Sequence, residues 1–92
     1  MKKIELSQEI WKEGNMYIAY CPELDIPACG ESVEVAKKNL GEVILINIEE
    51  MKENGSLDLF LEERGFFINE NIISNNRKIV DFQNIEMQIG VL

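Results

Sequence analysis

The side chains in this sequence that could do chemistry are two cysteines, Cys21 and Cys29, and 17 carboxylates, and the chain contains no histidine. Without histidine it lacks the usual general base at neutral pH and the commonest transition-metal ligand, so Ser-His and Cys-His nucleophilic pairs are excluded. The two cysteines are eight residues apart and make at most half of a zinc site. We therefore expect them to be ordinary small core or strand-end residues, and we expect no metal and no cofactor.

A carboxylate cluster that binds Mg²⁺ is the best enzymatic possibility. Such a nuclease needs several acids that converge on one point, typically from the first strand and the following helix. Glu5 and Glu9 alternate with apolar residues, whereas Glu34, Glu42 and Glu49 occupy the polar side of a predicted helix. This placement suits solvation rather than convergence. We expect no catalytic residues and no enzyme, and a metal-dependent nuclease is kept only as a remote alternative.

The net charge of the chain limits the kinds of partner that it can be expected to bind. Seventeen acidic against nine basic residues give a net charge of −8. This charge disfavours binding to a phosphate backbone, where Lys and Arg must displace counterions, and favours a basic partner or simple solubility. The polar N-terminus does not resemble a signal peptide, and no apolar run approaches the roughly 20 residues that cross a bilayer. We expect a cytoplasmic protein without membrane association.

Three strands are predicted in the first third of the chain. Gly14 and Asn15 separate two runs rich in apolar residues and are typical of a tight antiparallel hairpin turn. Pro22 cannot donate a hydrogen bond to a neighbouring strand, so it ends the second run. The sequence predicts an antiparallel sheet of residues 2–12, 16–22 and 27–31.

A long helix is predicted over residues 33–53, covering one face of this sheet. Ser32 is a typical N-cap, and apolar residues follow it at spacings of three and four. Gly55 supplies the left-handed conformation that ends such a helix. Ser56 is expected to cap a second helix over 57–64, and alternation predicts a terminal strand near 83–91. The predicted fold is α+β, with one domain over residues 1–92.

The predicted terminal strand would present an unpaired sheet edge, and self-association is one way to cover it. We therefore predict a homodimer with Ile85, Met87 and Ile89 as contact residues. Val35 and Ile46 lie off the main apolar face of the long helix and close to each other on an ideal helix. They are either a competing dimer interface or ordinary surface apolar residues.

The segment 17–36 reads YIAYCPELDIPACGESVEVA. The run Cys-Pro-Glu-Leu at a strand end, followed by Gly and by Ser-x-Glu-x-Ala at a helix start, resembles the HicB-like antitoxin family. The resemblance covers about the first half of the chain, and it departs from the family at Val35, where a Glu is usual. It implies a partial ribonuclease H-like fold.

The resemblance also implies a function. HicB-like antitoxins are non-catalytic proteins that neutralise a small basic toxin, which cleaves RNA, by masking its active surface. Many longer relatives carry a DNA-binding segment, but residues 66–92 contain only Arg77 and Lys78 as basic residues. We expect no separate DNA-binding domain and no direct binding of nucleic acid. The alternative is a stand-alone dimeric accessory or regulatory domain without a toxin partner.

The predicted partner-binding surface is acidic. Glu23, Asp25, Glu31 and Glu34 lie within twelve residues, and no Lys or Arg separates them. Glu31 and Glu34 also suit the positive end of the helix dipole, and Glu23 could brace its own loop. The four carboxylates are nevertheless expected to attract a basic toxin through long-range electrostatics.

Overall fold

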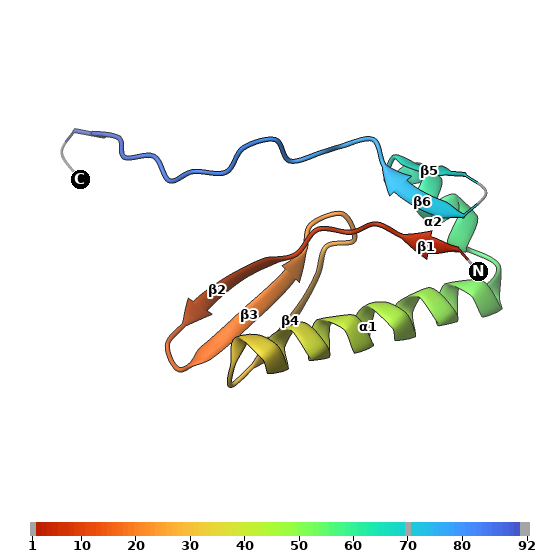
Figure 1. Ribbon diagram of the computed structural model, residues 1–92, viewed down its shortest axis with the longest axis horizontal. Helices are drawn as coiled ribbons and strands as arrows, with labels where there is room; N and C mark the ends of the chain where they lie inside the picture. Colours follow the sequence, from red (N-terminus) through yellow and green to blue (C-terminus); the bar gives the residue numbers. More distant parts are fainter. Residues whose placement is uncertain (1, 70, 91–92) are drawn as a thin grey trace.

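The computed structural model describes residues 2–69 and 71–90, which form an α+β fold (Figure 1). Along the chain the elements are β1 (Lys3–Ile4), β2 (Glu9–Glu13), β3 (Met16–Cys21), β4 (Ile26–Gly30), α1 (Val33–Asn54), α2 (Leu57–Glu63), β5 (Phe66–Ile68) and β6 (Ile72–Asn75). The strands form two sheets, β2-β3-β4 and β1-β6-β5. The structure confirms the predicted α+β class, the three-stranded antiparallel sheet, the long helix and the short helix. It also has the predicted C-terminal strand, but this strand, β6, lies earlier in the chain than expected.

The hairpin between β2 and β3 forms as the Gly-Asn pair predicts. Glu13 pairs with Met16 across a two-residue turn. Gly14 has a φ of +58°, whereas Asn15 keeps a negative φ, the pattern of a type II′ turn. Such turns match the twist of the flanking strands, so this turn fixes the register of both.

The prediction of one continuous strand over residues 2–12 is wrong. The structure divides this segment into β1, which pairs in parallel with β6, and β2, which pairs antiparallel with β3. Between them the backbone N–H of Ser7 donates to both carboxylate oxygens of Glu23, at 2.9 and 3.1 Å. A backbone donor that binds a side chain is not available to a strand partner, so the strand is interrupted there.

Helix α1 begins and ends at its predicted caps. The Ser32 hydroxyl accepts a hydrogen bond from the Val35 N–H at 3.1 Å, and Gly55 ends the helix in the left-handed conformation with a φ of +78°. The helix packs along β3 and β4 and covers one face of the sheet (Figure 1). The Asn39 side chain also donates to the Cys29 carbonyl at 2.8 Å, which fastens the helix to β4.

Small residues let the helix approach the sheet closely. Ala19, Cys21 and Ala36 are fully buried where they meet. At Gly30 a Cβ atom would lie 2.6 Å from the Ala36 backbone nitrogen and 2.7 Å from a Val35 methyl. Such distances are too short for any side chain, so only glycine allows the helix start to lie against the end of β4.

Helix α2 and the small sheet close the other end of the core. Leu61 of α2 and Phe66 of β5 are buried in the same cluster as Leu40 of α1. The prediction that the Ser56 side chain caps α2 is wrong. The Ser56 hydroxyl and N–H both donate to the Asn54 side-chain oxygen, at 2.6 and 3.0 Å, so the hydroxyl is already bound.

The predicted strand near 83–91 is not formed in the described residues, and residue 91 lies outside them. The last strand is β6, and residues 76–90 continue as an extended segment that leaves the domain (Figure 1). We call residues 76–90 the tail. Its alternating residues Ile85, Met87 and Ile89 are 74%, 74% and 67% exposed. Alternation makes a strand only where a sheet edge receives it, and in the described part of this single chain no strand pairs with the tail.

Candidate functional site

The β2-β3-β4 sheet has one covered and one open face. Successive side chains of a strand point to opposite faces, so the strand register assigns each residue to one of them. Trp11, Ile18 and Cys29 are cross-strand neighbours on the face opposite α1. The same register places five further residues beside them, and we call the whole set the open face: Glu9, Trp11, Glu13, Met16, Ile18, Tyr20, Pro27 and Cys29.

Two aromatic rings lie next to each other on the open face, and both are held in place. The Trp11 and Tyr20 rings meet edge to face, with centroids 6.1 Å apart. The Trp11 ring N–H donates to a Glu13 carboxylate oxygen at 2.8 Å, and the Tyr20 hydroxyl donates to Asp25 at 2.6 Å. Trp11 is nevertheless 39% exposed. An exposed ring in a fixed orientation loses little side-chain entropy when a partner covers it.

Carboxylates surround these rings. The hydrogen bond to Asp25 raises the pKa of the Tyr20 hydroxyl above its ordinary value, and desolvation and the negative charges of Asp25 and Glu9 act in the same direction. Tyr20 therefore remains a protonated donor at neutral pH. Lys12 belongs to the other face, where its amino group lies 5.6 Å from the Tyr17 ring. The open face thus combines negative charge with aromatic rings, a combination that suits Arg and Lys side chains.

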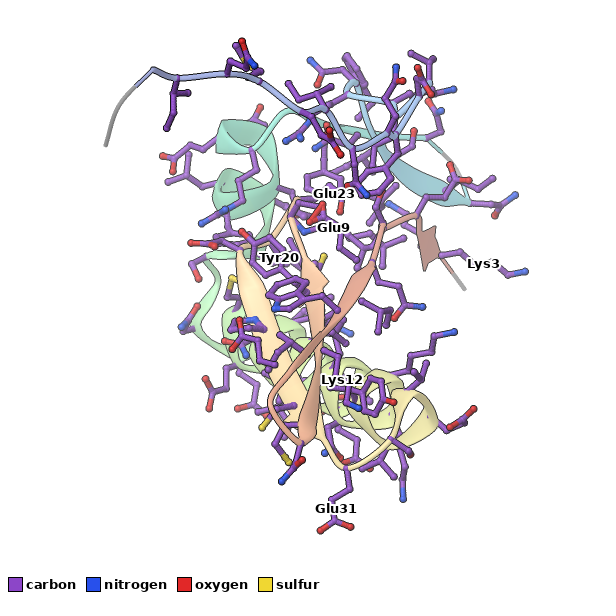
Figure 2. The ribbon with its side chains drawn as sticks, turned by 90° about the vertical axis from the view of Figure 1, so that its left-hand side faces the viewer. Lys3, Glu9, Lys12, Tyr20, Glu23 and Glu31 are labelled. Atoms are coloured by element: carbon purple, nitrogen blue, oxygen red, sulfur yellow. The ribbon has the colours of Figure 1, made fainter. Side chains whose placement is uncertain are left out.

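The four predicted site residues are not brought together into one surface. Glu23 and Asp25 lie in the loop before β4, whereas Glu31 and Glu34 lie beyond its far end. Figure 2 shows Glu23 and Glu31 at opposite ends of the sheet. Five residues of β4 separate the two pairs, a length of roughly 16 Å at the usual rise per residue.

Glu23 has a structural role instead. Its carboxylate binds the Ser7 N–H and lies 3.5 Å from the Cys21 sulfur. Partial burial raises its pKa, but the hydrogen bonds from Ser7 outweigh this effect and leave the pKa below the ordinary glutamate value. An ionised Glu23 therefore fastens the segment before β2 to the loop after β3, whereas the sequence suggested only that it could brace its own loop.

Asp25 is the predicted site residue that adjoins the open face. It is exposed and has a φ of +54°, a left-handed conformation that Asp tolerates better than most residues. This conformation accompanies the hydrogen bond with Tyr20. The sequence reasoning missed Trp11, Glu13 and Tyr20, although the alternation of Glu9, Trp11 and Glu13 was the signal that could have identified them.

The predicted dimer contacts on α1 are both exposed. Ile46 is 58% exposed, and Val35 is 42% exposed although one of its methyl groups points toward Gly30. The tail contacts Ile85, Met87 and Ile89 lie outside the core. Within the described residues both sets are left largely exposed.

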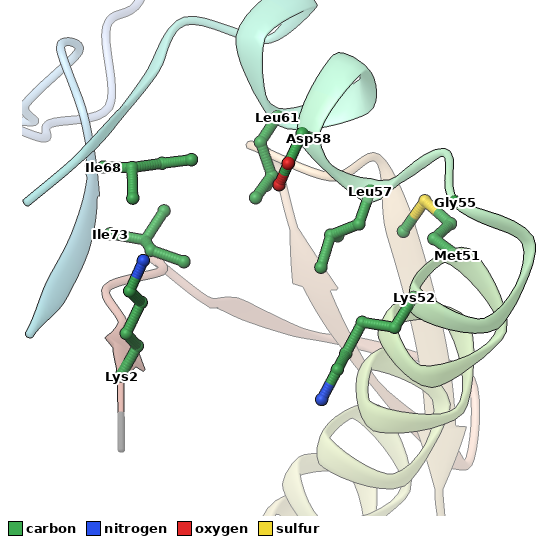
Figure 3. Close-up of a pocket in the computed structure, with 9 residues that line it drawn as sticks. All are labelled: Lys2, Met51, Lys52, Gly55, Leu57, Asp58, Leu61, Ile68 and Ile73. Carbon is green, nitrogen blue, oxygen red and sulfur yellow. The ribbon is translucent and has the colours of Figure 1, made fainter.

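A cavity of about 360 Å³ lies where the end of α1, helix α2 and the small sheet meet (Figure 3). Its walls are mainly aliphatic, with Leu57, Leu61 and Ile73 among them. Its charged groups are Lys2, Lys52 and Asp58. The cavity could hold a small apolar group, but it offers no arrangement of nucleophile and base.

The two cysteines lie on opposite faces of the sheet. Cys21 is buried toward α1, and burial raises its pKa to about 11, whereas Cys29 is exposed on the open face. In residues 2–69 and 71–90 no group of three or more Cys, Asp or Glu side chains is arranged to hold a metal ion. The same residues contain no helix with the length and apolar character that a membrane span requires.

Comparisons of the chain with protein-family models, with curated proteins and with solved structures find no match. The open face and its surroundings are therefore the features that bear on function.

Proposed function

We propose that this protein is a non-catalytic binding protein of the antitoxin type, which neutralises a small basic RNA-cleaving toxin by covering its active surface. The observation that carries the proposal is the open face, where fixed aromatic rings are surrounded by carboxylates. The resemblance of residues 17–36 to the HicB-like antitoxin family supports the class of partner.

The physical properties of the open face match the needs of such an interface. Aromatic residues are enriched among the side chains that dominate binding energy, and Trp11 and Tyr20 are neighbours on this face. The net charge of −8 would accelerate encounter with a basic protein. Carboxylates at the rim would pair with the Lys and Arg side chains that a ribonuclease uses to hold RNA.

A second candidate is a stand-alone dimeric accessory or regulatory domain without a toxin partner. The aliphatic cavity at the end of α1 favours it, because Lys2 and Lys52 beside an apolar wall suit a small ligand with an apolar body and a negative charge. In this case the dimer would use either the tail or the α1 residues Val35 and Ile46.

Co-expression with the product of the neighbouring gene separates the two candidates. An antitoxin restores growth that this product inhibits and co-purifies with it, and an accessory domain does neither.

Trp11→Ala should weaken binding to the toxin about 30-fold, equivalent to about 2 kcal/mol. Leu45→Ala is the matched control, because Leu45 is also exposed but lies on α1. Absence of both rescue and co-purification would refute the antitoxin proposal.

The remote nuclease alternative has its own test. Cleavage of RNA by the purified chain that requires a divalent metal and is lost in Glu5→Gln would refute both binding proposals.

A further inference from the structure

The tail carries apolar side chains that its own domain does not cover. Between residues 76 and 90 six large apolar side chains are more than half exposed: Ile79, Val80, Phe82, Ile85, Met87 and Ile89. Its last part alternates apolar and polar residues, with Glu86 and Gln88 between the apolar ones. Such a segment has the pattern of a half-buried strand but lacks a sheet edge.

One edge of the β2-β3-β4 sheet is closed to an additional strand. Pairing across the two-residue turn makes Glu13 and Met16 a hydrogen-bonded pair, and bonded pairs then alternate along both ladders. On β4 the outward-facing backbone groups are those of Pro27 and Cys29. Pro27 has no N–H, and the Cys29 carbonyl already accepts the Asn39 side chain at 2.8 Å.

The other edge, along β2, is open. The same alternation directs the backbone N–H and C=O groups of Ile10 and Lys12 outward. Within the described residues neither makes a backbone hydrogen bond outside the sheet. On the helix side of this edge a groove of about 270 Å³ lies between residues 6–8 and α1, with Leu6, Gly41 and Ile44 in its lining.

Within one chain the alternating part of the tail does not pair with this edge if the register between β1 and β6 is simply continued. β1 and β6 pair in parallel, with Lys3 opposite Ile72 and Ile4 opposite Ile73. Continuing this register would place residues 78–82 beside β2. Ile85 would then lie three residues beyond Glu13, past the hairpin turn. The segment 85–89 therefore extends past its own open edge.

We propose that residues 85–89 of one copy add as a strand to the β2 edge of a second copy, and that the two copies exchange tails reciprocally. The backbone of the tail would bind the outward groups of Ile10 and Lys12. Met87 and its apolar neighbours would lie on the helix side, in the groove beside Gly41. Glu86 and Gln88 would then join the open face. This dimer does not depend on the antitoxin function.

Sedimentation equilibrium of the full chain tests the exchange. The wild type should dimerise at tens of micromolar. Met87→Asp, which places a charge in the groove, and Lys12→Pro, which removes an outward N–H, should each weaken dimerisation at least tenfold. Lys12→Ala, which keeps the backbone N–H, is the control and should remain dimeric. A monomeric wild type, or a Lys12→Pro protein as dimeric as the wild type, would overturn the proposal.

Mixing the two disrupted variants distinguishes exchange from other dimers. Met87→Asp keeps an intact β2 edge, and Lys12→Pro keeps an intact tail, so one of the two arms can form between them. The mixture should form a heterodimer although each variant alone is monomeric. Circular dichroism must show that both variants are folded. If two folded variants do not associate on mixing, the tails do not exchange.

Discussion

The two faces of the β2-β3-β4 sheet differ although the same three strands build both. The covered face has small residues where it meets the helix, and Ala19 and Cys21 are fully buried in the same cluster as Leu40 of α1. The open face carries Trp11 and Tyr20, held by hydrogen bonds to carboxylates rather than by packing against another layer. The comparison shows how alternate residues of one strand can separate the requirements of the fold from those of binding.

The largest effect is expected at the centre of the covered face. Leu40 is 2% exposed, and Leu40→Ala would leave a cavity between helix and sheet. It should lower the free energy of unfolding by about 2–5 kcal/mol, measured by urea denaturation. Leu45→Ala on the exposed side of α1 should change it by less than about 0.5 kcal/mol. Equal effects of the two variants would contradict the packing described for α1.

Gly30→Ala should have the next largest effect. The new Cβ would meet the Ala36 backbone nitrogen at 2.6 Å, and backbone cannot move aside as a flexible side chain can. We expect a loss of about 1–3 kcal/mol in the free energy of unfolding. Gly41→Ala, where no atom lies within 4 Å of the new Cβ, should instead stabilise α1 by about 0.5–1 kcal/mol. A neutral Gly30→Ala would show that helix and strand are farther apart.

Glu23→Ala should cost about 1–2 kcal/mol at pH 7, because the Ser7 N–H loses a charged acceptor. The pKa of Glu23 is lowered in the folded state. Its contribution is therefore fully present above the ordinary glutamate pKa of about 4.3 and is lost as the pH falls through the lower folded value. The difference between wild type and variant in urea denaturation should shrink toward pH 3. Glu31→Gln serves as control, and a difference that is constant from pH 7 to pH 3 would contradict the bracing role.

Thiol alkylation should have the smallest effect on stability. It should nevertheless distinguish the two faces of the sheet by the reaction rates of their cysteines. Cys29 on the open face should react with iodoacetamide in the native protein without unfolding it. Cys21 should be protected, because it is buried and its pKa is raised to about 11. Mass spectrometry of peptides after short labelling gives the two rates. Equal rates would contradict the assignment of the cysteines to opposite faces.

The parts of the fold that sequence reasoning predicted depend on local signals. The Gly14 turn, the Ser32 cap and the Gly55 stop each act within a few residues, so hairpin and helix are predictable. The interrupted first strand depends on Ser7 and Glu23, which are 16 residues apart. No local pattern identifies such a contact.

The candidate site was less predictable for the same reason. Glu23, Asp25, Glu31 and Glu34 are close in sequence, but β4 runs between the two pairs and separates them. The open face, by contrast, joins Glu9 to Tyr20 through strand pairing. The tail shows the opposite error: its alternation of apolar and polar residues predicts a strand, but within the described residues no strand pairs with it.

Charge reversal at two places tests most directly whether the open face is the binding face. The pairs Glu9→Lys with Glu13→Lys, and Glu31→Lys with Glu34→Lys, each change the net charge from −8 to −4, because each replaces two negative charges by two positive ones. The measurement is the association rate with the basic toxin that we propose as the partner, at low salt, by stopped flow. The open-face pair should slow association at least tenfold more than the helix-start pair. Equal rates for the two variants would contradict the account and place the contact surface elsewhere.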